Sequence, residues 1–172
     1  MAQAYVKKGK RRKALQLMRE AALMDETYPS PNPDERIKLL VELGDLLLLQ
    51  SEPQAYELYL RASRLYGEHY PEQVTTPFTA PVRLKPGTFH ALADERLMGQ
   101  EGSEYFAVLH YDVNSKGRVE NIRVLQANVP GTQLRNLKIE LKHARFRPRI
   151  DQGELARAED RRIRITYQEP TT

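Results

Sequence analysis

Residues 105–125 read YFAVLHYDVNSKGRVENIRVL and contain two strand-like runs joined by turn residues. The first run places alternate residues on one face of a strand: Tyr105, Ala107, Leu109, Tyr111 and Val113. Residues 114–117 predict a tight turn, in which Gly117 suits a positive φ. In the return run the spacing of Val119, Ile122 and Val124 is uneven, which predicts a bulge or a change of face. We therefore expect an irregular β-hairpin.

A helix and a third strand follow the hairpin. Thr132 is the expected N-cap of the helix, whose buried stripe consists of Leu134, Leu137, Leu141 and Ala144. A turn at residues 151–153 leads to a last strand in which apolar or aromatic residues alternate with polar ones. The first set is Ile163, Ile165 and Tyr167, and the second is Arg162, Arg164 and Thr166. A right-handed crossover in this β-β-α-β order predicts the sheet order 2-1-3, with the third strand parallel to the second. The third strand should then form an exposed edge.

The chain before residue 70 has helical periodicity instead. The first expected helix carries an apolar face that Asp25 interrupts: Ala14, Leu17, Met18 and Ala21. Asn32 as N-cap and Pro33 at the first helical position start a second helix. Residues 51–54 read as a capping box for a third helix, which carries Ala55, Tyr59, Ala62 and Tyr66 on one stripe. Two helices joined by so short a turn should pack antiparallel.

Residues 71–102 separate the two patterns. The first part is rich in proline and reads as an extended linker or strap, and residues 89–98 could form a short helix. The expected fold class is therefore α+β, with helices in residues 1–70, a linker in residues 71–102 and a β-β-α-β domain in residues 103–172.

The helical part resembles a tetratricopeptide repeat over residues 4–70. The resemblance is carried by Leu40, Leu43, Gly44, Leu47, Ala55, Tyr59 and Ala62, where small residues allow two helices to approach closely. It implies a peptide groove on the helix face that carries Lys38, Val41, Asp45 and Leu48. The alternative is that this face packs against the second half of the chain.

Residues 103–168 resemble the C-terminal domain of TonB, the periplasmic energy transducer of Gram-negative bacteria. The matching positions are Val113, Asn114, Gly117, Val119, Asn121, Ile122, Val124, Leu125, the helix 134–144, Phe146, Pro148 and Gly153. In that family the last strand pairs with a short segment of an outer-membrane transporter. The resemblance implies a periplasmic protein connected with transport, whose signal or anchor would precede residue 1.

By β-augmentation the partner segment would line up along the last strand. The expected site is then Arg162, Ile163, Arg164, Ile165 and Thr166. The alternative interpretation is an edge strand that is charged to prevent aggregation.

Composition narrows the function classes. The 172 residues are 40% hydrophobic and 29% charged, as in globular proteins, and the absence of cysteine excludes disulfides and thiolate metal sites. No apolar run approaches the ~20 residues of a membrane span. The four histidines have no metal-ligand spacing and no glycine-rich phosphate loop occurs. We expect no catalytic residue, metal or cofactor, and thus a non-enzymatic interaction protein.

Two further alternatives remain open. Residues 7–13 (KKGKRRK) could bind phosphate groups of nucleic acid or anionic lipid, or form a solvated loop between helices, since no aromatic residue interleaves the charges. The chain could also be a tetratricopeptide scaffold or assembly factor, whose sheet pairs with a second copy to form a homodimer.

Overall fold

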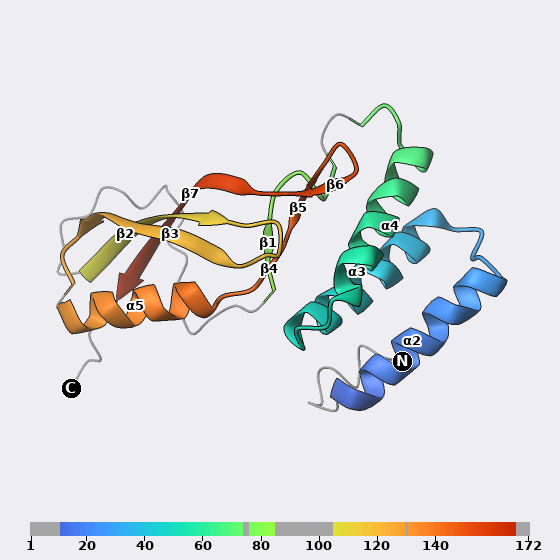
Figure 1. The fold of residues 1–172 in the computed structure, drawn as a ribbon, viewed down its shortest axis with the longest axis horizontal. Coiled ribbons are helices and arrows are strands. Elements are labelled where there is room, and N and C mark those ends of the chain that lie inside the picture. Colours follow the sequence, from blue (N-terminus) through green and yellow to red (C-terminus); the bar gives the residue numbers. More distant parts are fainter. Residues whose placement is uncertain (1–10, 74–75, 85–104, 130, 168–172) are drawn as a thin grey trace. The chain divides into compact units, whose positions relative to one another are not determined.

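The computed structural model describes residues 11–73, 76–84, 105–129 and 131–167, and it confirms the mixed α+β class (Figure 1). Its contacts divide the chain into two units. The helical unit comprises Met1–Ala80 together with Ile150–Leu155. The sheet unit comprises Pro81–Arg149 and Ala156–Thr172. The division falls inside the proline-rich segment, and a short hairpin from the second half of the chain belongs to the helical unit.

Three helices form the helical unit: α2 (Arg11–Thr27), α3 (Pro33–Leu49) and α4 (Gln54–His69). The start of α3 is as predicted, because the side chain of Asn32 accepts a hydrogen bond of 3.0 Å from the Asp34 N–H. The helices α3 and α4 pack closely where Gly44 lies against Tyr59. A Cβ at position 44 would lie 2.7 Å from Cε1 of the Tyr59 ring, so the expected need for a small residue here is confirmed.

The predicted capping box at Ser51 is wrong. Ser51 has φ 62° and ends α3 instead of starting α4: its N–H bonds to the Leu48 carbonyl, and the Glu52 N–H bonds to the Leu47 carbonyl, each at 3.0 Å. This pair of bonds is a Schellman motif, which satisfies the last carbonyls of a helix. The helix α4 follows at Gln54 without a side-chain cap.

The expectation that Asp25 interrupts the apolar face of α2 is wrong. Asp25 is part of the buried face of this helix. The buried stripe is Leu15, Met18, Ala22 and Asp25. Asp25 is 8% exposed, accepts a hydrogen bond of 3.0 Å from the Ser30 N–H, and pairs with Arg36 Nε of α3 at 3.0 Å. Burial alone would raise the pKa of Asp25, but these two partners, together with the nearby charge of Arg61, lower it.

Phe78 connects α4 to the hairpin of β5 (Arg149–Asp151) and β6 (Glu154–Ala156), of which Ile150–Leu155 belong to the helical unit. The centroid of its buried ring lies 6.3 Å from that of Tyr66, with the two rings nearly perpendicular, and its carbonyl accepts a hydrogen bond of 2.9 Å from the Ile150 N–H. The turn predicted at residues 151–153 is present, with φ of 50° at Gln152 and 82° at Gly153. The sequence patterns did not predict the two short strands beside it.

The sheet unit is built on three long strands: β2 (Tyr105–Val113), β3 (Val119–Ala127) and β7 (Ala158–Tyr167). Their order is β3-β2-β7 and both pairings are antiparallel, so β3 and β7 run parallel to each other. This is the predicted order of second, first and third strand. The predicted turn is also present, with φ 69° at Gly117.

The helix α5 (Gly131–His143) covers one face of this sheet. Its Leu137 and Leu141 join the alternate apolar residues of β2 in one core: Ala107, Leu109, Tyr111 and Val113. Thr132 lies inside the helix and is not its N-cap, which shifts the predicted boundary by two residues. A short pair, β1 (Val82–Arg83) with β4 (Phe146–Arg147), completes the unit, while the helix expected at residues 89–98 lies outside the described residues.

Candidate functional site

In the three-stranded sheet, β3 and β7 are the edge strands, each with β2 as its neighbour on one side. They differ in regularity. The pairing of β3 with β2 shifts register twice, between Val108 and Leu109 and again between His110 and Asp112. The pairing of β7 with β2 is continuous over seven residue pairs, from Tyr105 opposite Tyr167 to Tyr111 opposite Arg161. Bulges blunt an edge against further pairing, so β7 is the better template for an added strand.

A hydrogen bond near the start of β2 shows in which direction the main-chain N–H and C=O groups of each residue in β7 point. The Asn128 N–H donates to the Phe106 carbonyl at 3.0 Å, so the main chain of Phe106 points toward β3. Because these directions alternate along a strand, those of Ala107 and Leu109 point toward β7. In the antiparallel register, the main-chain groups of their partners Ile165 and Ile163 then point toward β2. The main-chain groups of Arg162, Arg164 and Thr166 therefore face away from the sheet.

The five predicted site residues lie on the two faces of β7. Ile165 is 2% exposed and Ile163 packs against the same core, beneath α5. On the other face the guanidinium of Arg164 lies 4.2 Å from the centre of the Phe106 ring, a cation–π contact, and Arg162 is exposed. Arg164 and Thr166 take part in further interactions within the chain. The prediction that these residues contact a partner is not tested by their placement.

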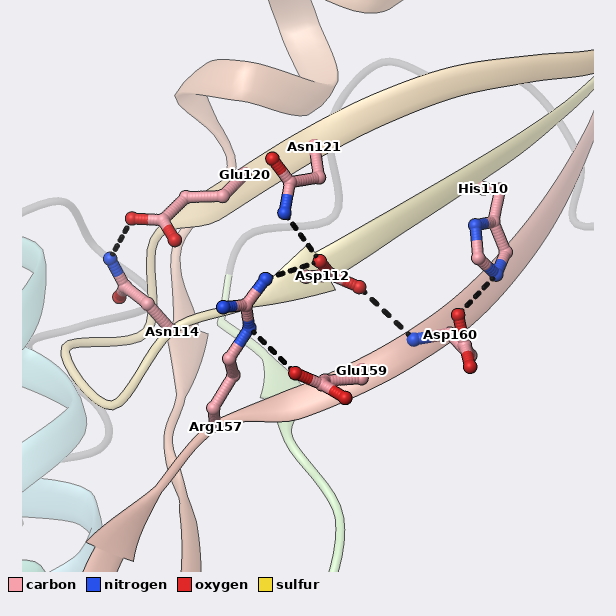
Figure 2. Close-up of polar contacts among 8 residues, drawn as sticks. All are labelled: His110, Asp112, Asn114, Glu120, Asn121, Arg157, Glu159 and Asp160. Carbon is pink, nitrogen blue, oxygen red and sulfur yellow. Dashed lines mark hydrogen bonds and ion pairs between the residues drawn. The ribbon is translucent and has the colours of Figure 1, made fainter.

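A buried carboxylate marks the point where the regular part of β7 begins. Asp112 of β2 is 4% exposed (Figure 2). Its Oδ2 accepts hydrogen bonds from Asn121 Nδ2 at 2.7 Å and from an Arg157 nitrogen at 2.5 Å, and its Oδ1 accepts the Asp160 N–H at 3.1 Å. Neighbours on both sides of the central strand thus converge on one side chain.

Two of these neighbours are bulge residues in the left-handed region. Asn121 has φ 53° and Asp160 has φ 56°, a conformation that Asn and Asp tolerate better than most residues. The bulge of β3 confirms the one predicted from the spacing of Val119, Ile122 and Val124. Asp112 stabilises both bulges at once, and beyond Asp160 the strand β7 pairs in uniform register. The carboxylate therefore positions the start of the candidate edge.

The hydrogen bond from Asn121 and the one from Arg157 lower the pKa of Asp112 to about 2, against the opposing effect of burial. Asp112 is consequently ionised at neutral pH, with acceptor bonds on both oxygens. Around it His110 Nε2 lies 3.2 Å from Asp160, and Arg157 Nε lies 3.4 Å from Glu159. The groups of this cluster bind one another, which makes it an anchor for strand geometry. Sequence reasoning missed it, although the irregular spacing around Asn121 was a signal.

The groove expected from the tetratricopeptide resemblance is partly closed. Lys38 is exposed and Val41 is half-buried, but Leu48 is 3% exposed. Asp45 accepts a hydrogen bond of 2.9 Å from the Tyr59 hydroxyl. A peptide on this face would find Lys38 and Val41 accessible, while Leu48 is already used in packing.

Three further sequence-based expectations concern the basic run, membrane spans and metal sites. Arg11 to Lys13 form the first turn of α2, and residues 7–10 of the basic run lie outside the described residues. None of the helices that the structure describes is both long and apolar enough to cross a membrane. Within the same residues, no group of three or more His, Asp or Glu side chains is placed to hold a metal ion.

A comparison with protein-family models and with curated protein sequences finds no match for this chain.

Proposed function

We propose that this is a non-enzymatic periplasmic protein that binds an extended segment of a partner protein along the β7 edge, at residues 161–167. The observation that carries the proposal is the uninterrupted register of β7 over seven pairs, at the end of a sheet whose other edge is broken by bulges. An incoming strand needs such a run, because its main chain must find donors and acceptors at every second residue.

The resemblance of residues 103–168 to the TonB C-terminal domain supports this mode of binding. In that family the last strand pairs with a segment of an outer-membrane transporter, and here β7 is the corresponding strand. The β-β-α-β order and the central position of β2 agree with such a domain. On this proposal the protein serves envelope transport, and its partner is an outer-membrane transporter or another envelope protein.

The charges of β7 indicate what the partner segment would carry. Arg162 and Arg164 lie on the face opposite α5, and Arg162 pairs across the sheet with His110. Acidic or hydroxyl side chains at alternate positions of a partner strand would meet these groups, as cross-strand pairs of opposite charge do. Arg164 and Thr166 already interact within the chain, so the test is placed at Arg162, whose main-chain groups also face away from β2.

The proposal is tested by two variants at one position. Arg162→Pro removes a main-chain N–H that faces away from β2, whereas Arg162→Ala removes only the side chain. The probe is a labelled extended peptide in which Glu and Val alternate, and binding is followed by fluorescence anisotropy. We expect Arg162→Pro to weaken binding roughly fivefold or more relative to Arg162→Ala, because a main-chain hydrogen bond is lost. NMR peaks of the β2 core serve as the check on folding.

Equal affinities of the two variants would exclude main-chain pairing at this edge. A stable homodimer in sedimentation that dissociates in Arg162→Pro, without peptide binding by either form, would favour the alternative, a scaffold that pairs its sheet with a second copy.

A further inference from the structure

The helical unit contains an open groove that none of the predicted sites uses. Its volume is about 640 Å³, and residues of α2, α3 and α4 line it. The floor is apolar, formed by the buried side chains of Leu43 and Leu47. On α2, Leu23 lines the groove although it is 63% exposed, which is unusual for a large aliphatic residue beside other apolar groups.

The rim of this groove is basic. It carries Arg19 on α2 and Arg61 and Arg64 on α4, with Glu57 as the acidic member of the lining. Arg61 and Arg64 also line a second depression next to it, of about 290 Å³. Arg61 already interacts within the chain, so the charges that count for a ligand are those of Arg19 and Arg64, which are both exposed.

We propose that this groove binds an amphipathic helix of a partner protein, with aliphatic residues on one face and acidic residues beside them. An apolar trough between two helices matches the shape of a third helix, whose aliphatic side chains would reach Leu23, Leu43 and Leu47. Acidic residues flanking that stripe would meet Arg19 and Arg64 on opposite rims. The site is separate from the face of Lys38 and Val41 and does not depend on β7.

Charge complementarity disfavours two other occupants, residues 1–10 and a second copy of the chain docked through the same groove. Residues 1–10 contain Lys7, Lys8 and Lys10, which a basic rim would repel. A second copy docked symmetrically would bring the arginines of one groove toward those of the other. An acidic partner helix has neither conflict.

The probe is a labelled helical peptide with Leu at every third or fourth position and Glu beside them, compared with the same peptide carrying Lys in place of Glu. Binding to the full chain is measured by fluorescence anisotropy. We expect the acidic peptide to bind and the double variant Arg19→Glu and Arg64→Glu to weaken it about tenfold or more, since two rim contacts become repulsive. The matched control, Arg123→Glu and Arg135→Glu, changes the charge equally on exposed positions of the sheet unit and should leave the affinity unchanged.

Two further measurements complete the test. Leu23→Ser removes the exposed apolar contact and should also weaken binding of the acidic peptide. The peptide that carries Lys should bind more tightly to the Arg19→Glu and Arg64→Glu double variant than to the wild type. The proposal is overturned if the two peptides bind equally, or if the rim and control variants behave alike. Binding to phosphatidylglycerol vesicles but not to the peptide, if the Arg19→Glu and Arg64→Glu double variant abolishes it, would also overturn the proposal. So would a double variant whose only effect is to dissociate a dimer.

Discussion

Replacing Asp112 by Asn should destabilise the sheet unit in a way that depends on pH. The substitution keeps the size of the side chain but removes its charge and one acceptor. Asn121 and Arg157 both donate to Oδ2, so the new amide oxygen should stay there. The new NH₂ group then faces the Asp160 N–H, and the bond that holds the β7 bulge is lost.

The size of the effect follows from the pKa of Asp112, which is about 2 instead of the usual 3.8. At about 1.36 kcal/mol for each unit of pKa, ionised Asp112 contributes roughly 2 to 3 kcal/mol to the free energy of unfolding near pH 6. This figure already includes the hydrogen bond from the Asp160 N–H, which is one of the causes of the lowered pKa. Asp112→Asn should therefore lower the stability of the sheet unit by roughly 2 to 3 kcal/mol at pH 6.

The pKa of Asp112 is lowered on folding, so its contribution is present above pH 3.8 and is lost as the pH falls through about 2. Between pH 6 and pH 2 the difference between the wild type and Asp112→Asn should consequently shrink by about 2 kcal/mol. The assay is urea unfolding followed by the NMR peaks of Leu109 and Leu141, which report on the sheet unit alone. Glu140→Gln on the exposed side of α5 is the control. A difference that stays constant with pH, or an Asp112 carboxyl that titrates near 3.8, would refute the anchoring role.

Two predictions concern the helical unit. Gly44→Ala should lower the free energy of unfolding by about 1 to 3 kcal/mol, because the added Cβ would lie 2.7 Å from the ring of Tyr59; Gly67→Ala, with no atom within 4 Å of the added Cβ, should be neutral or stabilising. Equal effects in urea unfolding would show that the two helices do not need this close approach. Ser51→Gly should raise the thermal midpoint by relieving the positive φ, at about 0.5 to 1 kcal/mol; an unchanged or lower midpoint would contradict the Schellman geometry.

The sequence patterns predicted the sheet better than its polar anchor. Alternation in residues 105–113 is a local signal of a half-buried strand, and crossover handedness then leaves few strand orders. The uneven spacing around Asn121 indicated the bulge for the same local reason. That Asp112 accepts bonds from Asn121, Arg157 and the Asp160 main chain depends on contacts between distant residues, which no periodicity records.

The errors in the helical unit also have local causes. Ser51 fits an N-cap in composition, but the end of α3 needed a residue with positive φ at that position, and α4 begins three residues later. Asp25 was assigned to a break in the helix because it is charged, whereas Arg36 and the Ser30 N–H allow its burial. Helical periodicity predicted which residues of α3 would share the groove face. It could not predict that Leu48 on this face is buried, because burial depends on packing against other segments.

The most direct test of the central proposal is an NMR titration of the full chain with the extended Glu/Val peptide. We expect the largest amide shifts at residues 161–167, and we expect hydrogen exchange of the Arg162 N–H to slow when the peptide is bound, because this group then donates to the added strand. Shifts confined to β3 or to the helical unit, with unchanged exchange at Arg162, would show that the partner does not pair with β7.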